Sequence, residues 1–373
     1  MPETPAHPEP TEKAPEPEPD PKRPPVRQVR LTPASTIRPR PVRWVWEQRV
    51  PAGALTLLPG REGIGKSLAL VWMTAAITRG ELPGIHHGTP RPVIYAASED
   101  SWSHTVVPRL IAAKANLDMV FRVDVHTEAD RVSPLTLPTD VQDLAEIMKA
   151  NGVALLALDP LMSVLHAGID THRDRELRTA LDPLSAMADT TGAAVVGLAH
   201  FNKSASSDAL NLITGSRAFS AVSRAVISVA KDPDDDAGAC VMSQSKNNLG
   251  RLDLPHLRYV VRSATVDTEE GPAEVGRLEF TGESDRGVGD ILADGSSGEE
   301  RTARGEAADW LRAYLVDAGG EAAAKDIKKA ATADGLAVIT VERARTKAGV
   351  TVTRPAPGRP SVWSIDPYGS DSQ

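Results

Sequence analysis

The sequence has little sulfur and few aromatic residues. Only one of its 373 residues is a cysteine, Cys240, and only 4% are aromatic. A single cysteine excludes an intramolecular disulfide framework and any zinc site with several cysteine ligands. No apolar run approaches the roughly 18 residues that a membrane-spanning helix needs, and the first residues lack the basic-then-apolar pattern of a signal peptide. We therefore expect a cytoplasmic protein with no membrane contact.

The charge balance is acidic. The chain carries 42 Lys and Arg against 50 Asp and Glu, a formal net charge of -8. This argues against a globally basic coat for nucleic acid but leaves local basic patches open. With 41% hydrophobic and 25% charged residues, the composition is typical of a folded chain with a buried core. The length predicts two or three domains.

Composition divides the chain into five parts. Residues 1–30 hold many prolines and acids and predict a disordered tail, either solvating or in contact with a partner. Apolar strands alternate with helices over 31–281, which predicts a mostly parallel sheet with helices on both faces and an antiparallel extension. Residues 282–300 are acidic and rich in glycine, which predicts a linker. Three helices and a hairpin over 301–366 are the sequence shape of a winged helix, and 367–373 form a tail.

The strongest chemical signal is a G-x-x-x-x-G-K-S element between an expected strand and an Ala/Leu-rich helix. Its glycines let backbone N–H groups converge on a β-phosphate, and the helix N-terminus adds a favourable dipole. In this pattern Lys66 reaches the β- and γ-phosphates and Ser67 ligates Mg²⁺. The residues predicted to bind nucleotide here are Gly60, Glu62, Gly63, Ile64, Gly65, Lys66, Ser67 and Leu68.

Polar side chains stand at the ends of three expected strands. Asp159 ends VALLALD, a Walker B pattern in which the carboxylate holds the metal's water shell. Glu99 follows VIYAAS and could orient and deprotonate an attacking water; Asp100 is equally eligible, and either acid could instead be solvated or cap a helix. His200 ends AAVVGLAH, where it could sense a γ-phosphate or have only a structural role.

Two regions offer positive charge to a nucleic-acid backbone. The small, polar loop 201–217 could follow such a backbone or be a mobile surface loop. Residues 337–360 hold five basic residues against one acid, a positive face that suits phosphate contacts, although winged helices also serve as protein–protein modules. The predicted nucleic-acid contacts are Lys203, Arg217, Arg343, Arg345 and Lys347.

The order and spacing of these elements resemble the RecA-like ATPases of the RepA-type hexameric helicase group, AAA family ATPases of phages, plasmids and integrated elements. The resemblance covers about Val42 to Thr281. It rests on GREGIGKS, VIYAASED, LLALDPL and AVVGLAHFNK, followed by GSRAFSAVSRAV and QSKNNLG. It implies an α/β fold with a RecA-like P-loop core, closed by a winged-helix-like domain. It also implies ATP and Mg²⁺ as cofactors, single-stranded DNA as a partner and a hexameric ring.

The resemblance also assigns roles to single residues. It makes Glu99 the catalytic carboxylate and His200 the γ-phosphate sensor. An arginine that reaches the neighbouring subunit's nucleotide maps to Arg224. Related helicases often carry Lys-x-Arg near the last hairpin; here Lys246 is kept and an asparagine, Asn248, replaces the arginine. The residue acting in trans is therefore either Arg224 or Lys246, and the site would be complete only between subunits.

Two functions remain after this reading. The first is an ATP-hydrolysing motor on single-stranded DNA, a replicative helicase or a related DNA-replication ATPase of a mobile element. The alternative is a RecA-like regulatory or adaptor ATPase that uses nucleotide as an assembly switch and binds a protein partner through its C-terminal domain. A motor needs nucleic acid to accelerate its turnover, whereas a switch hydrolyses slowly and without that response.

Overall fold

The computed structural model describes most of the chain. The described residues are 29–126, 132–202, 204, 206–235, 237–294, 298–345, 347–353 and 361–365, with no side chains for 298–304. Several sequence predictions fall wholly or partly outside them: Lys203 and part of its loop, most of the tail 1–30, part of the linker, part of the region 301–366, and the tail 367–373.

The compact α/β unit begins at Val42 rather than at residue 31. The described residues before it belong to a separate unit and contain one short 3-10 turn, η1 (Ala34–Thr36). Val29, Leu31 and Ile37 in this unit are exposed. The segment therefore contributes no buried side chain of its own to a core.

A nine-stranded sheet forms the centre of the larger unit, in the order β13-β12-β11-β10-β3-β9-β8-β4-β5. The six strands from β10 to β5 run parallel, and β11, β12 and β13 extend the sheet antiparallel. This confirms the predicted α/β class with its antiparallel extension. The strands are β3 (Leu55–Gly60), β4 (Val93–Ala97), β5 (Val120–Arg122), β8 (Leu155–Asp159), β9 (Ala194–His200), β10 (Ala225–Lys231), β11 (Cys240–Asn247), β12 (His256–Thr268) and β13 (Gly271–Ser284).

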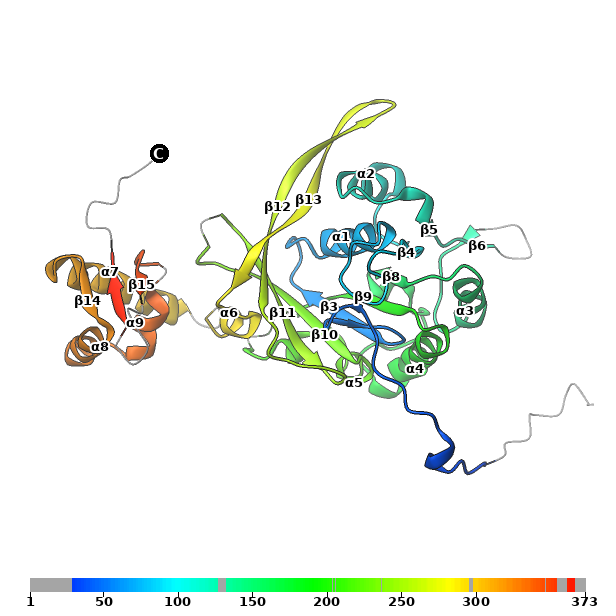
Figure 1. The fold of residues 1–373 in the computed structure, drawn as a ribbon, viewed down its shortest axis with the longest axis horizontal. Helices are drawn as coiled ribbons and strands as arrows, with labels where there is room; N and C mark the ends of the chain where they lie inside the picture. Colours follow the sequence, from blue (N-terminus) through cyan, green and yellow to red (C-terminus); the bar gives the residue numbers. More distant parts are fainter. Residues whose placement is uncertain are drawn as a thin grey trace, which may run out of the picture. The chain divides into compact units, whose positions relative to one another are not determined.

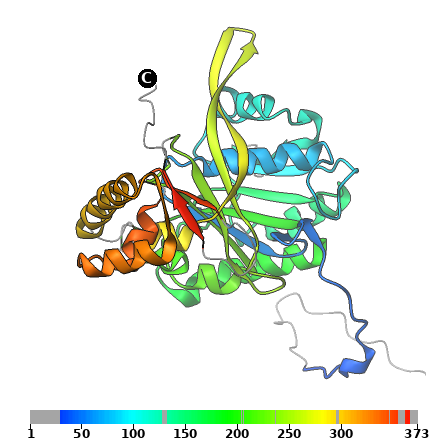
Figure 2. The same cartoon turned by 60° about the vertical axis from the view of Figure 1, so that its left-hand side comes forward.

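Helices cover both faces of this sheet, with α1 and α2 (blue and cyan) on one side and α3, α4 and α5 on the other (Figure 2). Successive strand residues point to opposite faces, so Leu57 packs toward α4 while Leu58 packs toward α1. The continuous apolar strands of the sequence follow from this double coverage. The helices are α1 (Lys66–Thr78), α2 (Val107–Ala112), α3 (Val141–Ala150), α4 (Asp174–Thr191), α5 (Ala218–Val222) and α6 (Val288–Asp294).

Short elements fill the connections. A π-turn, η2 (Trp102–Val106), precedes α2, and a 3-10 turn, η4 (Leu161–Val164), follows β8. The other short elements are β1 (Trp44–Trp46), β2 (Val50–Pro51), η3 (Leu117–Met119), β6 (Val125–His126), β7 (Val132–Ser133) and η5 (Ala209–Leu212).

Most of the predicted linker is folded. Residues 282–294 complete β13 and form α6, whose Val288 and Ile291 are buried in the core under the sheet. Arg286 forms ion pairs with Asp232, Asp234 and Asp294. The linker prediction is therefore wrong for 282–294, because Val288 and Ile291 are buried and Asp294 pairs with Arg286 instead of facing solvent.

Strands β12 and β13 form a long two-stranded ribbon that continues past the rest of the sheet (Figure 1). Residues near its base pack on α1 and α2. Hairpin-like spacing in the sequence predicts this pair, but nothing local in the sequence predicts its length.

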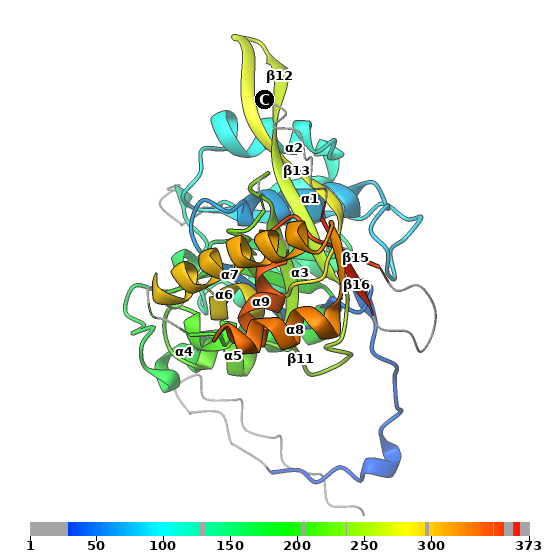
Figure 3. The same cartoon turned by 90° about the vertical axis from the view of Figure 1, so that its left-hand side faces the viewer.

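The C-terminal residues form a module with its own core (Figure 3). Leu311, Ile327 and Trp363 are fully buried there. Three helices and a hairpin occur as predicted, and a strand, β14, precedes the second helix and completes an antiparallel sheet of order β14-β16-β15. The elements are α7 (Gly298–Asp317), β14 (Glu321–Ala323), α8 (Ala324–Ala333), α9 (Val338–Ala344), β15 (Thr351–Thr353) and β16 (Val362–Ser364). Across the described segments, no helix combines the length and apolar character that a membrane crossing requires.

Candidate active site

The glycine-rich loop leaves the carboxyl end of β3, every residue of which is buried. Strand β3 lies between β9 and β10, which follow it much later in the chain. The loop therefore opens at a position where the strand order of the sheet reverses, and ligands usually bind at such a position in parallel sheets. A Cβ on Gly60 would meet the Val229 carbonyl oxygen at 2.7 Å, so only glycine fits there. Gly65 has a φ of 85°, which also favours glycine immediately before α1.

Lys66 and Ser67 start helix α1 at this loop. The Lys66 side chain is buried, and its Nζ donates to the carbonyl oxygens of Gly60 (3.0 Å) and Arg61 (2.6 Å). Burial lowers the pKa of Lys66, while the nearby carboxylates of Asp159 and Glu62 oppose this shift. The ammonium is thus held on the loop that would surround a phosphate.

Asp159 ends β8 and faces Ser67. The Ser67 hydroxyl donates to its Oδ1 (3.3 Å), and the Tyr95 hydroxyl donates to its Oδ2 (2.8 Å). Burial raises the pKa of Asp159, and the two hydroxyl hydrogen bonds counteract the shift. Both carboxylate oxygens are therefore oriented by neutral donors.

The structure separates the two acids that follow β4. Glu99 is exposed, and its Oε1 accepts a hydrogen bond from the Ser163 hydroxyl at 3.0 Å. Asp100 instead forms an ion pair with Arg109 of α2, with Nη1 and Oδ2 2.9 Å apart. Arg109 already occupies the Asp100 carboxylate, whereas Glu99 accepts from a neutral hydroxyl, so the geometry leaves Glu99 freer than Asp100 to contact a water molecule.

His200 ends β9 directly opposite Gly60 of β3. Its ring Nδ1 is buried, with no hydrogen-bond partner among the described residues. The backbone on both sides of this residue is tied down: Phe201 N donates to Gly60 O (3.1 Å), and Thr214 N donates to His200 O (2.8 Å). The histidine therefore sits where the loop after β9 leaves the sheet.

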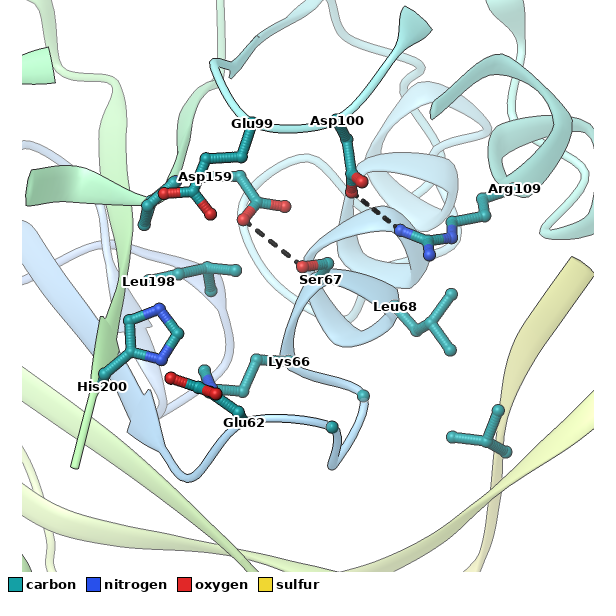
Figure 4. A pocket seen from close by; sticks show the side chains of 14 residues that line it. Glu62, Lys66, Ser67, Leu68, Glu99, Asp100, Arg109, Asp159, Leu198 and His200 are labelled. Carbon is teal, nitrogen blue, oxygen red and sulfur yellow. Dashed lines mark hydrogen bonds and ion pairs between the residues drawn. The ribbon is translucent and has the colours of Figure 1, made fainter. Parts of the chain in front are cut away.

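These side chains line one cavity of about 390 Å³ (Figure 4). The predicted residues Glu62, Gly63, Gly65, Lys66, Ser67, Leu68, Glu99, Asp159 and His200 all face it. Gly60 and Ile64, which were also predicted, are not among its lining residues. The cavity is also lined by Asp100, Arg109, Pro160, Leu198 and Val261. Sequence reasoning missed Arg109 and Val261, since α2 and β12 carry no local motif that points to a nucleotide.

The donors in this cavity suit Mg²⁺ and a nucleotide phosphate chain. Ser67 Oγ and Asp159 Oδ1 are adjacent hard oxygen ligands, which Mg²⁺ prefers alongside phosphate oxygens and water. Within the described residues no three His, Cys, Asp or Glu side chains form a metal cluster by themselves. A magnesium ion shared with phosphates needs few protein ligands, so the residues present fit this cofactor.

Two of the predicted cations lie at the amino-terminal ends of the parallel strands, away from the glycine-rich loop. Arg224 precedes β10, its backbone N–H donates to Leu55 O, and its side chain lines a different cavity of about 570 Å³. Lys246 Nζ donates to the carbonyl oxygens of Ser220 (2.6 Å) and Ser223 (2.8 Å) at the end of α5. The length of β3, about 17 Å at 3.3 Å per residue, separates them from the loop. Neither residue therefore lines the nucleotide cavity of its own chain.

The predicted nucleic-acid contacts differ in exposure. Arg217 is exposed at the start of α5, and Arg343 and Lys347 are exposed in the C-terminal module. The Arg345 guanidinium packs over the Trp363 ring at 5.0 Å, and its Nε donates to a backbone carbonyl. The basic face of the module is thus smaller than the sequence predicts.

Comparisons with known proteins agree with this geometry. A family model described as AAA domain matches residues 20–206, just over half of the chain. No curated protein matches the chain. The parallel strands, the loop at the end of β3 and the acid at the end of β8 form a RecA-like P-loop core. The chain belongs to the AAA domain family of P-loop ATPases.

Proposed function

We propose that this protein is an ATP-driven motor on single-stranded DNA, a replicative helicase or related DNA-replication ATPase of a mobile element. The observation that carries the proposal is the connection between the nucleotide cavity and the loop after β9. His200 faces the cavity, and backbone hydrogen bonds tie both ends of the loop to His200 and Gly60. A displacement of either residue would therefore move the loop.

The hydrolytic chemistry follows from the side chains in the cavity. Lys66 and the loop amides bind the phosphates, and Ser67 and Asp159 hold Mg²⁺, which neutralises phosphate charge when bound. Glu99 accepts a proton from the attacking water, and Ser163 restricts the orientation of that carboxylate. Leu198 and Val261 exclude solvent from part of the cavity.

The loop after β9 would convert this chemistry into movement. Its base is a small antiparallel bridge between Phe201 and Ile213, supported by a hydrogen bond from Asn202 N to Leu212 O (2.7 Å). Lys203 and Arg217 would then follow the DNA backbone as phosphate contacts, which give affinity without reading sequence.

A ring of six copies would complete the nucleotide site. Arg224 is exposed, about a strand length from its own cavity, and so is placed to serve a neighbouring subunit. Lys246 already donates to backbone carbonyls at the end of α5, and its pKa is lowered by burial and by Arg224. Between the two residues we therefore propose Arg224 as the one that acts in trans.

The second candidate function is an adaptor ATPase that uses nucleotide as an assembly switch. The packing of Arg345 on Trp363 favours it, since the Arg345 guanidinium is then less available to contact DNA phosphates on the winged-helix-like module. Lys347 stays exposed, and Arg343 pairs with Asp294 of α6 at 3.6 Å. The module would therefore hold DNA in the motor, or a protein partner in the switch, mainly through Lys347.

Steady-state ATP hydrolysis with and without single-stranded DNA separates the two functions. The Lys66→Ala variant gives the blank, because it loses the phosphate-binding ammonium in either case. For a motor we expect DNA to raise turnover by about tenfold or more, which is well below the 10³- to 10⁵-fold acceleration that an arginine finger can give to phosphoryl transfer. Slow turnover that DNA leaves unchanged would contradict the motor and favour the switch.

A further inference from the structure

Tyr95 lies on β4, the strand beside β8, and its side chain is almost fully buried. Its register partner on β8 is Ala157, two residues before Asp159. The Tyr95 ring packs edge-on against Trp102, with centroids 6.3 Å apart and planes at 89°. The sheet and the π-turn thus hold the ring in one position.

The Tyr95 hydroxyl has one proton to donate, and it donates to Asp159. A tyrosine hydroxyl is protonated at neutral pH, so it can act as the donor in this pair. Its partner atom is Oδ2 at 2.8 Å, while Oδ1 accepts from Ser67 at 3.3 Å. Each carboxylate oxygen has its own hydroxyl partner, and the two partners come from different elements.

Tyr95 does not line the nucleotide cavity. It lines a neighbouring cavity of about 380 Å³, together with Trp102 and Ser101. The hydrogen bond to Asp159 is therefore the direct contact between Tyr95 and the nucleotide cavity.

We propose that Tyr95 is the positioning residue of the magnesium site. Its phenol holds Oδ2 of Asp159 so that Oδ1 stays beside Ser67 Oγ, and the two oxygens face the cavity together. Without this hydrogen bond the carboxylate can rotate about its terminal torsion, which is broad and shallow in free side chains. This inference rests on the proposed ATPase function, and it concerns a residue that no nucleotide-binding motif includes.

The test is a titration of Mg²⁺ against binding of a fluorescent ATP analogue, with a second measurement in EDTA. Tyr95→Phe keeps the ring and removes only the donor. We expect the half-saturating Mg²⁺ concentration to rise about tenfold, the lower end of losses seen when groups behind metal ligands are removed. The affinity measured in EDTA should stay unchanged.

Tyr259→Phe is the matched control. Tyr259 is also a fully buried tyrosine, but its hydroxyl donates to the backbone oxygen of Ile64 in the glycine-rich loop (2.6 Å) and not to Asp159. Its loss should alter nucleotide affinity equally with and without Mg²⁺. A Mg²⁺ shift of the same size in both variants would overturn the proposal.

The remaining outcomes are also decisive. If Tyr95→Phe has the circular dichroism of the wild type and an unchanged half-saturating Mg²⁺ concentration, the proposed role of Tyr95 is overturned, while the proposed ATPase function is not affected. A wild-type chain with no Mg²⁺-dependent nucleotide binding would instead remove the proposed function, and the inference with it. If Tyr95→Phe does not fold, Trp102→Leu loosens the same ring; we expect a rise of about threefold, and no rise would overturn the proposal.

Discussion

Arg109 pairs with Asp100, with Nη1 and Oδ2 2.9 Å apart, while the adjacent Glu99 faces the nucleotide cavity and accepts a hydrogen bond from the Ser163 hydroxyl. Two neighbouring acids that are equivalent in the sequence thus differ in the structure. The guanidinium occupies the carboxylate of one, while the other faces the cavity and accepts from a neutral hydroxyl, so it is placed to accept a hydrogen bond from the attacking water.

Glu99→Gln should therefore abolish most hydrolysis while leaving nucleotide binding intact. Positioned general bases contribute about 10²- to 10⁴-fold, so we expect a loss of that order in kcat. The matched variant Asp100→Asn should retain kcat within about tenfold of the wild type. Phosphate release and binding of a fluorescent ATP analogue measure the two effects separately. A larger loss in Asp100→Asn than in Glu99→Gln would reverse the assignment.

Arg224 and Lys246 should respond differently to substitution. Arg224→Ala should lose hydrolysis but keep nucleotide binding and thermal stability, since the side chain is exposed. Lys246→Met should lower stability by about 1–2 kcal/mol, because the carbonyl oxygens of Ser220 and Ser223 lose a charged donor. Thermal unfolding and phosphate release on the two purified variants distinguish these effects.

Mixing two inactive variants tests whether Arg224 acts in trans. Lys66→Ala supplies an intact arginine and Arg224→Ala an intact lysine, so random assembly makes about a quarter of the interfaces complete. Hydrolysis should recover toward that fraction when the two chains are mixed and allowed to exchange subunits. A mixture as inactive as its components, with exchange shown by labelled chains, would contradict action in trans.

The buried carboxylate of Asp159 should cost folding free energy at neutral pH. Its pKa is raised by burial, so the folded state holds its proton more tightly than the unfolded state, whose pKa is about 3.9. The cost is absent below the unfolded pKa and complete above the raised one. Asp159→Asn should therefore be at least as stable as the wild type at neutral pH, with an advantage that shrinks as pH falls through the raised pKa. Urea unfolding without nucleotide at several pH values measures this difference, and a wild type that is more stable at neutral pH would contradict it.

Local sequence patterns predicted much of the site but not the contacts behind it. Lys66, Ser67 and Asp159 were predictable because a loop motif and a strand end are continuous in sequence. Tyr95 reaches Asp159 across 64 residues, and Ser163 reaches Glu99 across the same separation. Such pairs depend on which strands become neighbours, and no spacing within one element encodes that.

The same limit explains the error at the predicted linker, and it leads to a prediction about Arg286. This side chain is one-quarter exposed and contacts three aspartates, of which Asp294 is the most buried. Replacing one partner of a buried ion pair leaves uncompensated charge, so Arg286→Met should destabilise the protein by about 3 kcal/mol. The control is Arg251→Met, because Arg251 pairs with Asp253 at the surface, where both are more than two-thirds exposed; its loss should leave the free energy of unfolding nearly unchanged. Urea unfolding gives both values, and hydrogen exchange at Val288 and Ile291 should speed up only in Arg286→Met. Equal stability of the two variants would mean that the aspartates are solvated and that α6 is held by its apolar residues alone.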